Sequence, residues 1–312
     1  MELEDKGHDI FNELVSRSFL QDVHERYYRF IPTIYCKMHD LVHDLAQSIT
    51  RNECCCILED KEFEGGQSVA MRHVSIGRGV TAMIVEKVAL TFSKSMRTLV
   101  QLYFSPPKIL KSLPANSLRV LALPTNHFKD IPVSIDHLKH LRYLNLSCTD
   151  VETLPEVTTR LFHLQTLKLE GCDNLRELPK GIKNLKNLRH LCIHGCDKLK
   201  YMPSGMGNLI LLRTLTKYVV GSKTGSGSIR ELKELKISGE FELEGLNNVR
   251  NGEDAKEARL SSKHGLQSVT LRWDDVDEQS VENVEEVIEC LQPPQTIKKL
   301  NIYCYPGTVF PN

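Results

Sequence analysis

One short pattern recurs along the middle of this 312-residue chain and constrains its fold more than any other feature. The pattern is Leu-x-x-Leu-x-Leu, and its copies begin at Leu118, Leu141, Leu164, Leu188 and Leu212. They therefore recur every 23 or 24 residues. The first four copies each run on to a hydrophobic residue followed by proline, at Ile131-Pro132, Leu154-Pro155, Leu178-Pro179 and Met202-Pro203. A unit this short cannot bury its apolar face alone, so the copies must stack.

The pattern predicts an α/β fold, a leucine-rich-repeat solenoid of horseshoe shape. Its last two leucines lie two residues apart, so both point from one face of a short strand into the core. The residues beside them point to the concave surface. A further position, three residues past the third leucine, needs a small side chain that can hydrogen-bond the backbone of a neighbouring coil. It is occupied in successive copies by Asn126, Thr149, Cys172 and Cys196.

Composition narrows the class of protein. Lys plus Arg and Asp plus Glu each number 40, so no overall charge points to nucleic acid or to a membrane surface. The charged start, Met1 to Lys6, is not followed by an apolar run, and no stretch approaches the length of a membrane span. Ten cysteines without a secretory signal indicate reduced thiols. We expect a cytoplasmic protein.

The chain divides into three regions. Residues 1–52 predict a small winged-helix-like module, because apolar residues of 10–15 and 41–49 fall on helical faces and 34–38 reads as a strand. Asp40 is placed to cap the second helix. Residues 53–95 are interpreted as a linker with degenerate capping repeats. Residues 96–312 carry the leucine-rich repeats, regular over 118–215 and irregular, with an acidic insert, over 216–312.

Residues 37–46, Lys-Met-His-Asp-Leu-Val-His-Asp-Leu-Ala, resemble the MHD motif of plant nucleotide-binding leucine-rich-repeat disease-resistance proteins of the coiled-coil class. Residues 11–19 resemble the segment that precedes that motif. The resemblance implies a non-enzymatic intracellular immune receptor whose repeats recognise a pathogen-derived or guarded host protein and restrain an ADP/ATP switch. It also implies that His39 contacts the β-phosphate of ADP in a full-length receptor, with Asp40 ordering the helix start.

The sequence contains no Gly-x-x-x-x-Gly-Lys-Ser/Thr loop. We therefore expect a fragment that holds no cofactor by itself and that contacts the nucleotide-binding domain as an intramolecular partner. Two alternatives stay open. One is a generic leucine-rich-repeat interaction adaptor. The other is a zinc hydrolase, because His39 and His43 lie four apart on one helix face, although no third ligand can be identified.

The concave face is the expected protein-binding surface, because mixed polar and aromatic side chains on a rigid sheet suit protein recognition. We expect these residues to lie on it: Tyr143, Asn145, Lys168, Glu170, His190, Cys192, His194 and Thr216. A metal site at His190, Cys192 and His194 is disfavoured, since alternate strand residues lie about 6–7 Å apart. Cys54-Cys55-Cys56 is disfavoured too, because adjacent side chains point to opposite faces.

Two charged segments complete the pattern. Residues 274–291 hold eight carboxylates above an apolar stripe, Val281, Val284, Val287, Ile288 and Leu291. A basic run lies on the convex and connecting side, at Lys180, Lys183, Lys186, Lys198 and Lys200. This basic run is either a solvated surface or a dock for the acidic insert or for the nucleotide-binding region. The Gly- and Ser-rich residues 221–228 predict a surface loop.

Overall fold

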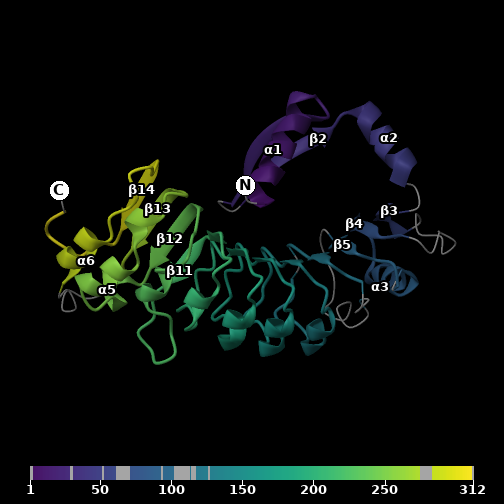
Figure 1. The fold of residues 1–312 in the computed structure, drawn as a ribbon. Helices are drawn as coiled ribbons and strands as arrows, with labels where there is room; N and C mark the ends of the chain where they lie inside the picture. The colour runs from purple at the N-terminus through teal and green to yellow at the C-terminus, as the bar shows by residue number, and fades with distance from the viewer. Residues whose placement is uncertain are drawn as a thin grey trace.

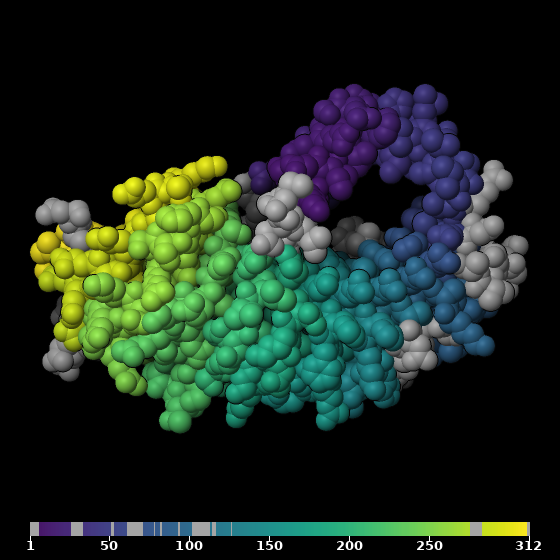
Figure 2. All heavy atoms as spheres, in the orientation of Figure 1, coloured from purple at the N-terminus to yellow at the C-terminus, as the bar shows by residue number. Residues whose placement is uncertain are grey.

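The computed structural model describes residues 3–28, 31–50, 53–60, 71–92, 94–101, 113, 117–125, 127–274 and 283–310. They form a curved solenoid with a row of parallel strands on one side and short helices on the other (Figure 1). The N-terminal module lies on the strand side and arches over it, leaving an open space beneath (Figure 2).

The module consists of two helices and a hairpin. Helix α1 (Leu3–Ser16) leads into strands β1 (Leu20–Tyr28) and β2 (Ile31–Met38), which pair antiparallel, and α2 (Asp40–Thr50) follows. These are the elements expected of a winged-helix-like module. The apolar side chains of α2 that the periodicity selected remain largely outside any core, since Leu41, Leu45 and Ile49 are 74%, 58% and 73% exposed.

An eight-stranded parallel sheet runs through the regular repeats in the order β10-β9-β8-β7-β6-β5-β4-β3. Its strands are β3 (Cys54–Glu59), β4 (His73–Gly79), β5 (Thr98–Gln101), β6 (Val120–Ala122), β7 (Tyr143–Asn145), β8 (Thr166–Lys168), β9 (His190–Cys192) and β10 (Thr214–Leu215). Cross-strand pairing aligns the second leucines of the repeat, Leu121, Leu144, Leu167, Leu191 and Leu215, which are all buried. The degenerate capping repeats are thus part of this sheet, with helix α3 (Ala82–Thr91) between β4 and β5.

The convex side is built from 3-10 turns that begin after the repeated prolines. They are η2 (Val133–His137), η3 (Glu156–Arg160), η4 (Lys180–Asn184) and η5 (Met206–Asn208). Pro132, Pro155 and Pro179 stand at the first three N-caps with φ of −66°, −65° and −62°. The pyrrolidine ring fixes this φ, and its missing N–H costs nothing where a helix begins. In these three coils the proline therefore sets where the chain turns, whereas η5 begins after Gly205, two residues beyond Pro203.

The small buried position behind the strand behaves largely as expected. The thiols of Cys172 and Cys196 donate to the carbonyls of Leu146 and Leu169 in the preceding coil, each at 3.1 Å. Thr149 departs from the expectation, because its hydroxyl donates to Leu146 of its own coil at 2.8 Å. A hydroxyl has a shorter reach than a thiol, so the nearer carbonyl is favoured. Asn126 lies outside the described residues.

A second sheet of four parallel strands begins where the regular period ends. Its strands are β11 (Lys217–Val219), β12 (Gly239–Glu244), β13 (Leu266–Arg272) and β14 (Lys299–Tyr303). The convex and connecting elements here are η6 (Ile229–Leu232), η7 (Leu246–Asn248), α5 (Gly252–Glu257), η8 (Leu260–Ser262) and α6 (Val284–Cys290). Cross-strand pairs such as Val269 with Leu300 confirm the irregular repeats. Of the predicted surface loop 221–228, residues 222–225 are exposed, whereas Gly227 is buried.

Helix α6 of the acidic insert does not dock on the basic coils. The apolar stripe of α6 is buried, but the helix packs against α5, and Glu285 accepts a hydrogen bond from Thr308 at 3.0 Å. Lys198 instead donates to Asn174, and Lys186 to the carbonyl of Asn208. The expectation of a charge-driven dock is therefore wrong for α6, because burying its apolar stripe next to α5 decides where it lies. Residues 275–282, including Val281, lie outside the described residues.

Candidate functional site

The concave surface of the eight-stranded sheet consists of two parallel columns of side chains. The first column, read along the pairing, is Cys54, His73, Thr98, Val120, Tyr143, Thr166, His190 and Thr214. The second is Cys56, Ser75, Val100, Ala122, Asn145, Lys168 and Cys192. Lys168 is the one Lys, Arg, Asp or Glu in these columns, so this face is mostly uncharged and made of short side chains.

The predicted contact residues in the middle of the sheet share this face. Tyr143 and Asn145 are half-buried on β7, and burial raises the pKa of the Tyr143 hydroxyl. Asn145 accepts the backbone N–H of Ser147 at 2.9 Å, which fixes its amide. Lys168 on β8 lies 3.4 Å from Glu170. Aromatic, amide and paired charged groups are thereby held in fixed positions on a hydrogen-bonded sheet.

The predicted histidine and cysteine positions on and after β9 have separate partners. His190 is hydrogen-bonded to Thr214 at 3.0 Å, and His194 lies 3.5 Å from Glu242 of the next sheet. Cys192 is only 6% exposed, and burial raises its pKa to about 12, so it offers neither a contact surface nor a nucleophile. In the part of the chain that the structure describes, no three His, Cys, Asp or Glu residues are placed to hold a metal ion.

The fifth copy of the repeat contains a departure that the sequence analysis passed over. Where the other copies have a third leucine or isoleucine, this one has Lys217. An ammonium group cannot replace a leucine in an apolar core without a large desolvation cost. The chain shifts by one residue instead, because after Leu215 the next core side chain is Tyr218. A one-residue shift exchanges the two faces of a strand, and here β10 ends and β11 begins.

Thr216 joins the two sheets at this shift. Its hydroxyl accepts the N–H of Ile193 at 2.8 Å, and its carbonyl accepts the N–H of Glu242 at 3.0 Å. Thr216 was expected to be a surface contact residue. It lines the concave cavity over the second sheet. It also connects the two sheets, because it is hydrogen-bonded to Ile193 after β9 and to Glu242 of β12.

Lys217 is the centre of a charge cluster on the second sheet. Its side chain is 2% exposed, and its ammonium lies 3.0 Å from Glu244 and 3.9 Å from Glu242. Burial raises the pKa of Glu244. Burial acts in the same direction on Glu242, but the hydrogen bond with His194 and the charge of Lys217 outweigh it and lower its pKa. Arg272 completes the cluster at 3.6 Å from Glu242.

The MHD-like segment places His39 at the start of α2. His39 is half-buried, its Nδ1 accepts the N–H of Leu41 at 3.2 Å, and its backbone N–H donates to Phe19 at 2.9 Å. The side chain that caps this helix is therefore His39, and the expectation that Asp40 caps it is wrong. Asp40 is the exposed first residue of α2, where its charge still favours the positive end of the helix dipole.

His43 lies one turn further along α2 and has different surroundings. It is exposed, its Nε2 is 3.3 Å from the amide of Gln47, and its Nδ1 is 3.7 Å from Asp44. Nδ1 of His39 already accepts the backbone N–H of Leu41, so this nitrogen is not free to bind a metal ion together with His43. The zinc-hydrolase alternative gains no support from this geometry.

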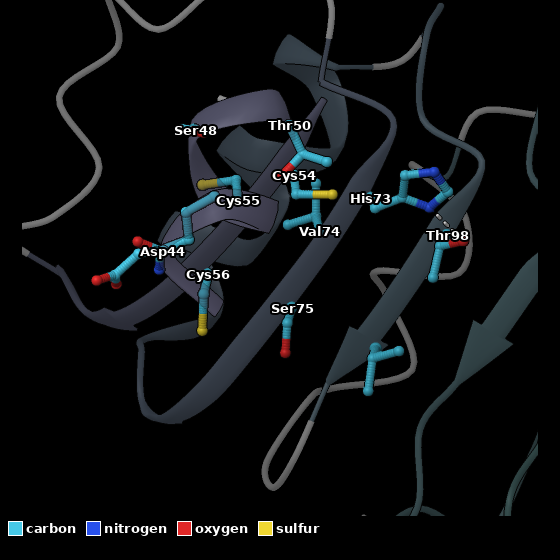
Figure 3. A pocket seen from close by; sticks show the side chains of 12 residues that line it. Asp44, Ser48, Thr50, Cys54, Cys55, Cys56, His73, Val74, Ser75 and Thr98 are labelled. Atoms are coloured by element: carbon cyan, nitrogen blue, oxygen red, sulfur yellow. Dashed lines mark hydrogen bonds between the residues drawn. The ribbon is translucent and has the colours of Figure 1, made fainter. Parts of the chain in front are cut away.

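A cavity of about 660 Å³ lies between α2 and the first strands of the solenoid (Figure 3). Asp44 and Ser48 line it from α2, while His73 points to Thr98 and is hydrogen-bonded to it at 3.0 Å. The three consecutive cysteines alternate, as expected, because Cys54 and Cys56 lie on the concave face and Cys55 packs against the core.

Among the helices of the described residues, none has the length and apolarity that a membrane crossing requires.

Comparisons with known proteins identify both parts of the chain. Residues 96–311 match the family described as leucine-rich repeat region, and residues 1–46 match the disease resistance protein winged helix domain. The disease resistance protein RGA2 of Solanum bulbocastanum is 37% identical over 313 residues, covering 100% of this chain and 29% of that protein.

A second relative is the putative disease resistance protein At3g14460 of Arabidopsis thaliana. It is 39% identical over 330 residues, covering 99% of this chain and 22% of that protein. The chain thus spans less than a third of the length of either relative. Both the repeat region and the winged-helix segment agree with the resemblance carried by the MHD-like motif. The chain belongs to the leucine-rich-repeat family, and it is similar over nearly its whole length to plant disease-resistance proteins.

Proposed function

We propose that this chain supplies the recognition surface and one switch element of an intracellular plant immune receptor. The concave face of the eight-stranded sheet would bind a pathogen-derived or guarded host protein, with no enzymatic step. One observation carries this proposal, namely the two concave columns, which present short polar side chains around Tyr143 and Lys168 on a rigid surface. Such surfaces bind proteins through a few anchoring residues surrounded by near-neutral contacts.

The test uses a full-length receptor that contains this chain. Tyr143→Ala with Lys168→Ala removes the aromatic and the charged group of the concave columns. Val133→Ala with Lys180→Ala is the matched control, because both residues are exposed on the convex side. We expect the concave pair to abolish the defence response to the recognised pathogen at unchanged protein level. Equal responses from the two pairs would contradict the proposal.

The switch element is His39. Because its Nδ1 accepts the N–H of Leu41, the neutral imidazole carries its proton on Nε2. A ring N–H at a helix N-terminus suits a phosphate, since the helix dipole also favours negative charge there. We infer that in the full-length receptor His39 donates to a phosphate of ADP, while the nucleotide-binding domain supplies the rest of the site. Bound ADP would hold the receptor in its closed state.

His39→Ala in the full-length receptor tests this role. Losing one charge-assisted hydrogen bond should reduce ADP retention by about 10- to 100-fold. His43→Ala is the control, because that side chain is exposed and one turn away, and it should leave retention unchanged. If His43→Ala releases ADP as readily as His39→Ala, the assignment of His39 fails.

A further inference from the structure

Three consecutive cysteines form the first half of β3, the strand at one end of the eight-stranded sheet. Cys54 and Cys56 are exposed and line the cavity of about 660 Å³ between α2 and the first strands of the solenoid. In Figure 3 the sulfur of Cys54 points to the side on which His73 lies, whereas that of Cys55 points the opposite way. Cys55 packs against the core instead. Cys54 and Cys56 thus meet solvent inside one cavity.

Accessibility separates these two thiols from most of the other cysteines. Cys172 and Cys196 are buried and donate to backbone carbonyls, and burial raises the pKa of Cys192 to about 12. A thiol that is buried and protonated is a poor nucleophile. The other exposed cysteines are Cys36 on β2 and Cys304 after β14, which do not line this cavity.

Each of the two cavity thiols has a hydrogen-bonding neighbour on the next strand. The register pairs Cys54 with His73 and Cys56 with Ser75, and paired strands lie about 4.8 Å apart. Nδ1 of His73 is hydrogen-bonded to Thr98 at 3.0 Å, which orients the ring and leaves Nε2 as its second hydrogen-bonding atom. A hydrogen-bond donor beside a sulfur atom stabilises the charge that develops on a leaving group when that sulfur reacts.

The reaction that suits these thiols is two-electron oxidation by hydrogen peroxide. The thiolate sulfur attacks one peroxide oxygen, so an S–O bond forms, the O–O bond breaks, and the second oxygen leaves as hydroxide. His73 beside Cys54, and Ser75 beside Cys56, donates a hydrogen bond to the leaving oxygen, which takes a proton from solvent and departs as water. The sulfur is thereby oxidised to a sulfenic acid, and the peroxide is reduced.

The two cavity thiols are too far apart to form a disulfide with each other. They lie two residues apart on one strand, so about 6–7 Å separates them, whereas the Cβ atoms of a disulfide lie about 3.5–4.5 Å apart. A sulfenic acid here therefore reacts with a thiol that enters from solvent, which forms an S–S bond and releases water. The volume of the cavity is in the range of pockets that hold small ligands.

We propose that Cys54 and Cys56 are the sites at which hydrogen peroxide, followed by a low-molecular-weight thiol, modifies this chain. The added group lies in the cavity, against Asp44 and Ser48 of α2. The site is separate from Tyr143 and from the concave surface around it. It can therefore be tested without a recognised protein or a nucleotide.

The experiment treats the 312-residue chain with limiting hydrogen peroxide and dimedone, which traps sulfenic acids, and assigns the label to each cysteine by fragment-ion mass spectrometry. Cys54 and Cys56 should be labelled at least about threefold faster than Cys36 and Cys304. When glutathione replaces dimedone, Cys54 and Cys56 should carry the mixed disulfide. Equal labelling of the four exposed cysteines would mean that exposure alone decides reactivity, and it would overturn the proposal.

Two substitutions test the paired neighbours. His73→Ala should slow labelling of Cys54 at least about tenfold and leave Cys56 within about twofold, whereas Ser75→Ala should slow Cys56 about threefold and spare Cys54. His190→Ala is the matched control, because it removes a histidine of the same concave column that is likewise hydrogen-bonded to a threonine. Circular dichroism verifies that each variant is folded. Slowing of Cys54 by His190→Ala as large as that by His73→Ala, or no slowing by either, would contradict the proposed role of the neighbours.

Discussion

The eight-stranded and four-stranded sheets bury the same kind of apolar ladder but handle charge in opposite ways. In the first, the concave columns are almost uncharged. In the second, Lys217, Glu242, Glu244 and Arg272 lie on the concave face and neutralise one another. The coils differ as well. Paired core positions are 23 residues apart at Leu144 and Leu167, but 31 apart at Val269 and Leu300.

The difference shows what a longer coil permits. Coils of 23 or 24 residues leave room for a 3-10 turn on the convex side, whereas the longer coils hold α5 and α6. Strands β12 and β13 have six and seven residues, as β3 and β4 at the start of the first sheet do, against three in β7 of the regular repeats. A longer strand presents more concave positions, and in this chain charged residues fill them. The following predictions test whether different interactions stabilise the two sheets.

The largest effect is expected at Lys217. Lys217→Met keeps the length of the side chain but leaves Glu242 and Glu244 without their buried cation, so the free energy of unfolding should fall by about 3–5 kcal/mol. Lys168→Met, in the first sheet, removes a more exposed ammonium and should cost less than about 1 kcal/mol. Urea denaturation of both variants measures the difference. Similar losses would mean that the charge cluster does not hold the second sheet together.

The buried hydroxyl of Thr149 comes next. Thr149→Val preserves shape but removes the donor to Leu146, which should cost about 1–3 kcal/mol. Thr270→Val in the second sheet alters a half-buried concave hydroxyl that accepts from Asn301 at 3.2 Å, and it should cost less than about 1 kcal/mol. Chemical denaturation of the two variants side by side decides whether the position behind the strand matters more than the concave one.

The turn after each strand offers a smaller, purely conformational test. Thr125, Cys148, Gly171 and Gly195 occupy one position in successive coils and all have positive φ, from 57° to 70°. Gly195→Ala should destabilise the chain by about 1–2 kcal/mol, because an L-residue is strained there. Cys148→Ala exchanges one strained residue for another and should stay within about 0.5 kcal/mol. Thermal unfolding distinguishes the pair, and equal shifts in Tm would refute the conformational explanation.

The smallest effect concerns pH at the junction of the two sheets. The hydrogen bond with Glu242 raises the pKa of His194 above its unfolded value, so its stabilisation is complete below that value and is lost as pH rises through the folded pKa. His194→Gln should therefore cost more at pH 5.5 than at pH 8. With the side chain 39% exposed, solvent screening limits the difference to less than about 1 kcal/mol. A cost that grows with pH would reverse this assignment.

Much of the concave site followed from periodicity, because a repeat that fixes the leucines also fixes which neighbours face away from them. Tyr143, Asn145, Lys168 and His190 lie where that reasoning placed them. The periodicity did not predict how exposed each side chain is, because Cys192 faces the concave side and is nevertheless buried. Lys217, at a leucine position of the fifth copy, is visible in the sequence, but only when the copies are compared at every position and not at the leucines alone.

The sequence by itself determined the solenoid, the pairing of its strands and the positions of its turns, since each depends on contacts between neighbouring repeats and on local backbone chemistry. The tertiary structure alone decided that the sheet divides at Thr216 and that His39, not Asp40, caps α2. It also decided that the acidic helix packs against α5. These outcomes depend on whether a particular charge or hydrogen-bonding group is desolvated or satisfied by residues distant in the chain, and a periodic pattern carries no information about that competition.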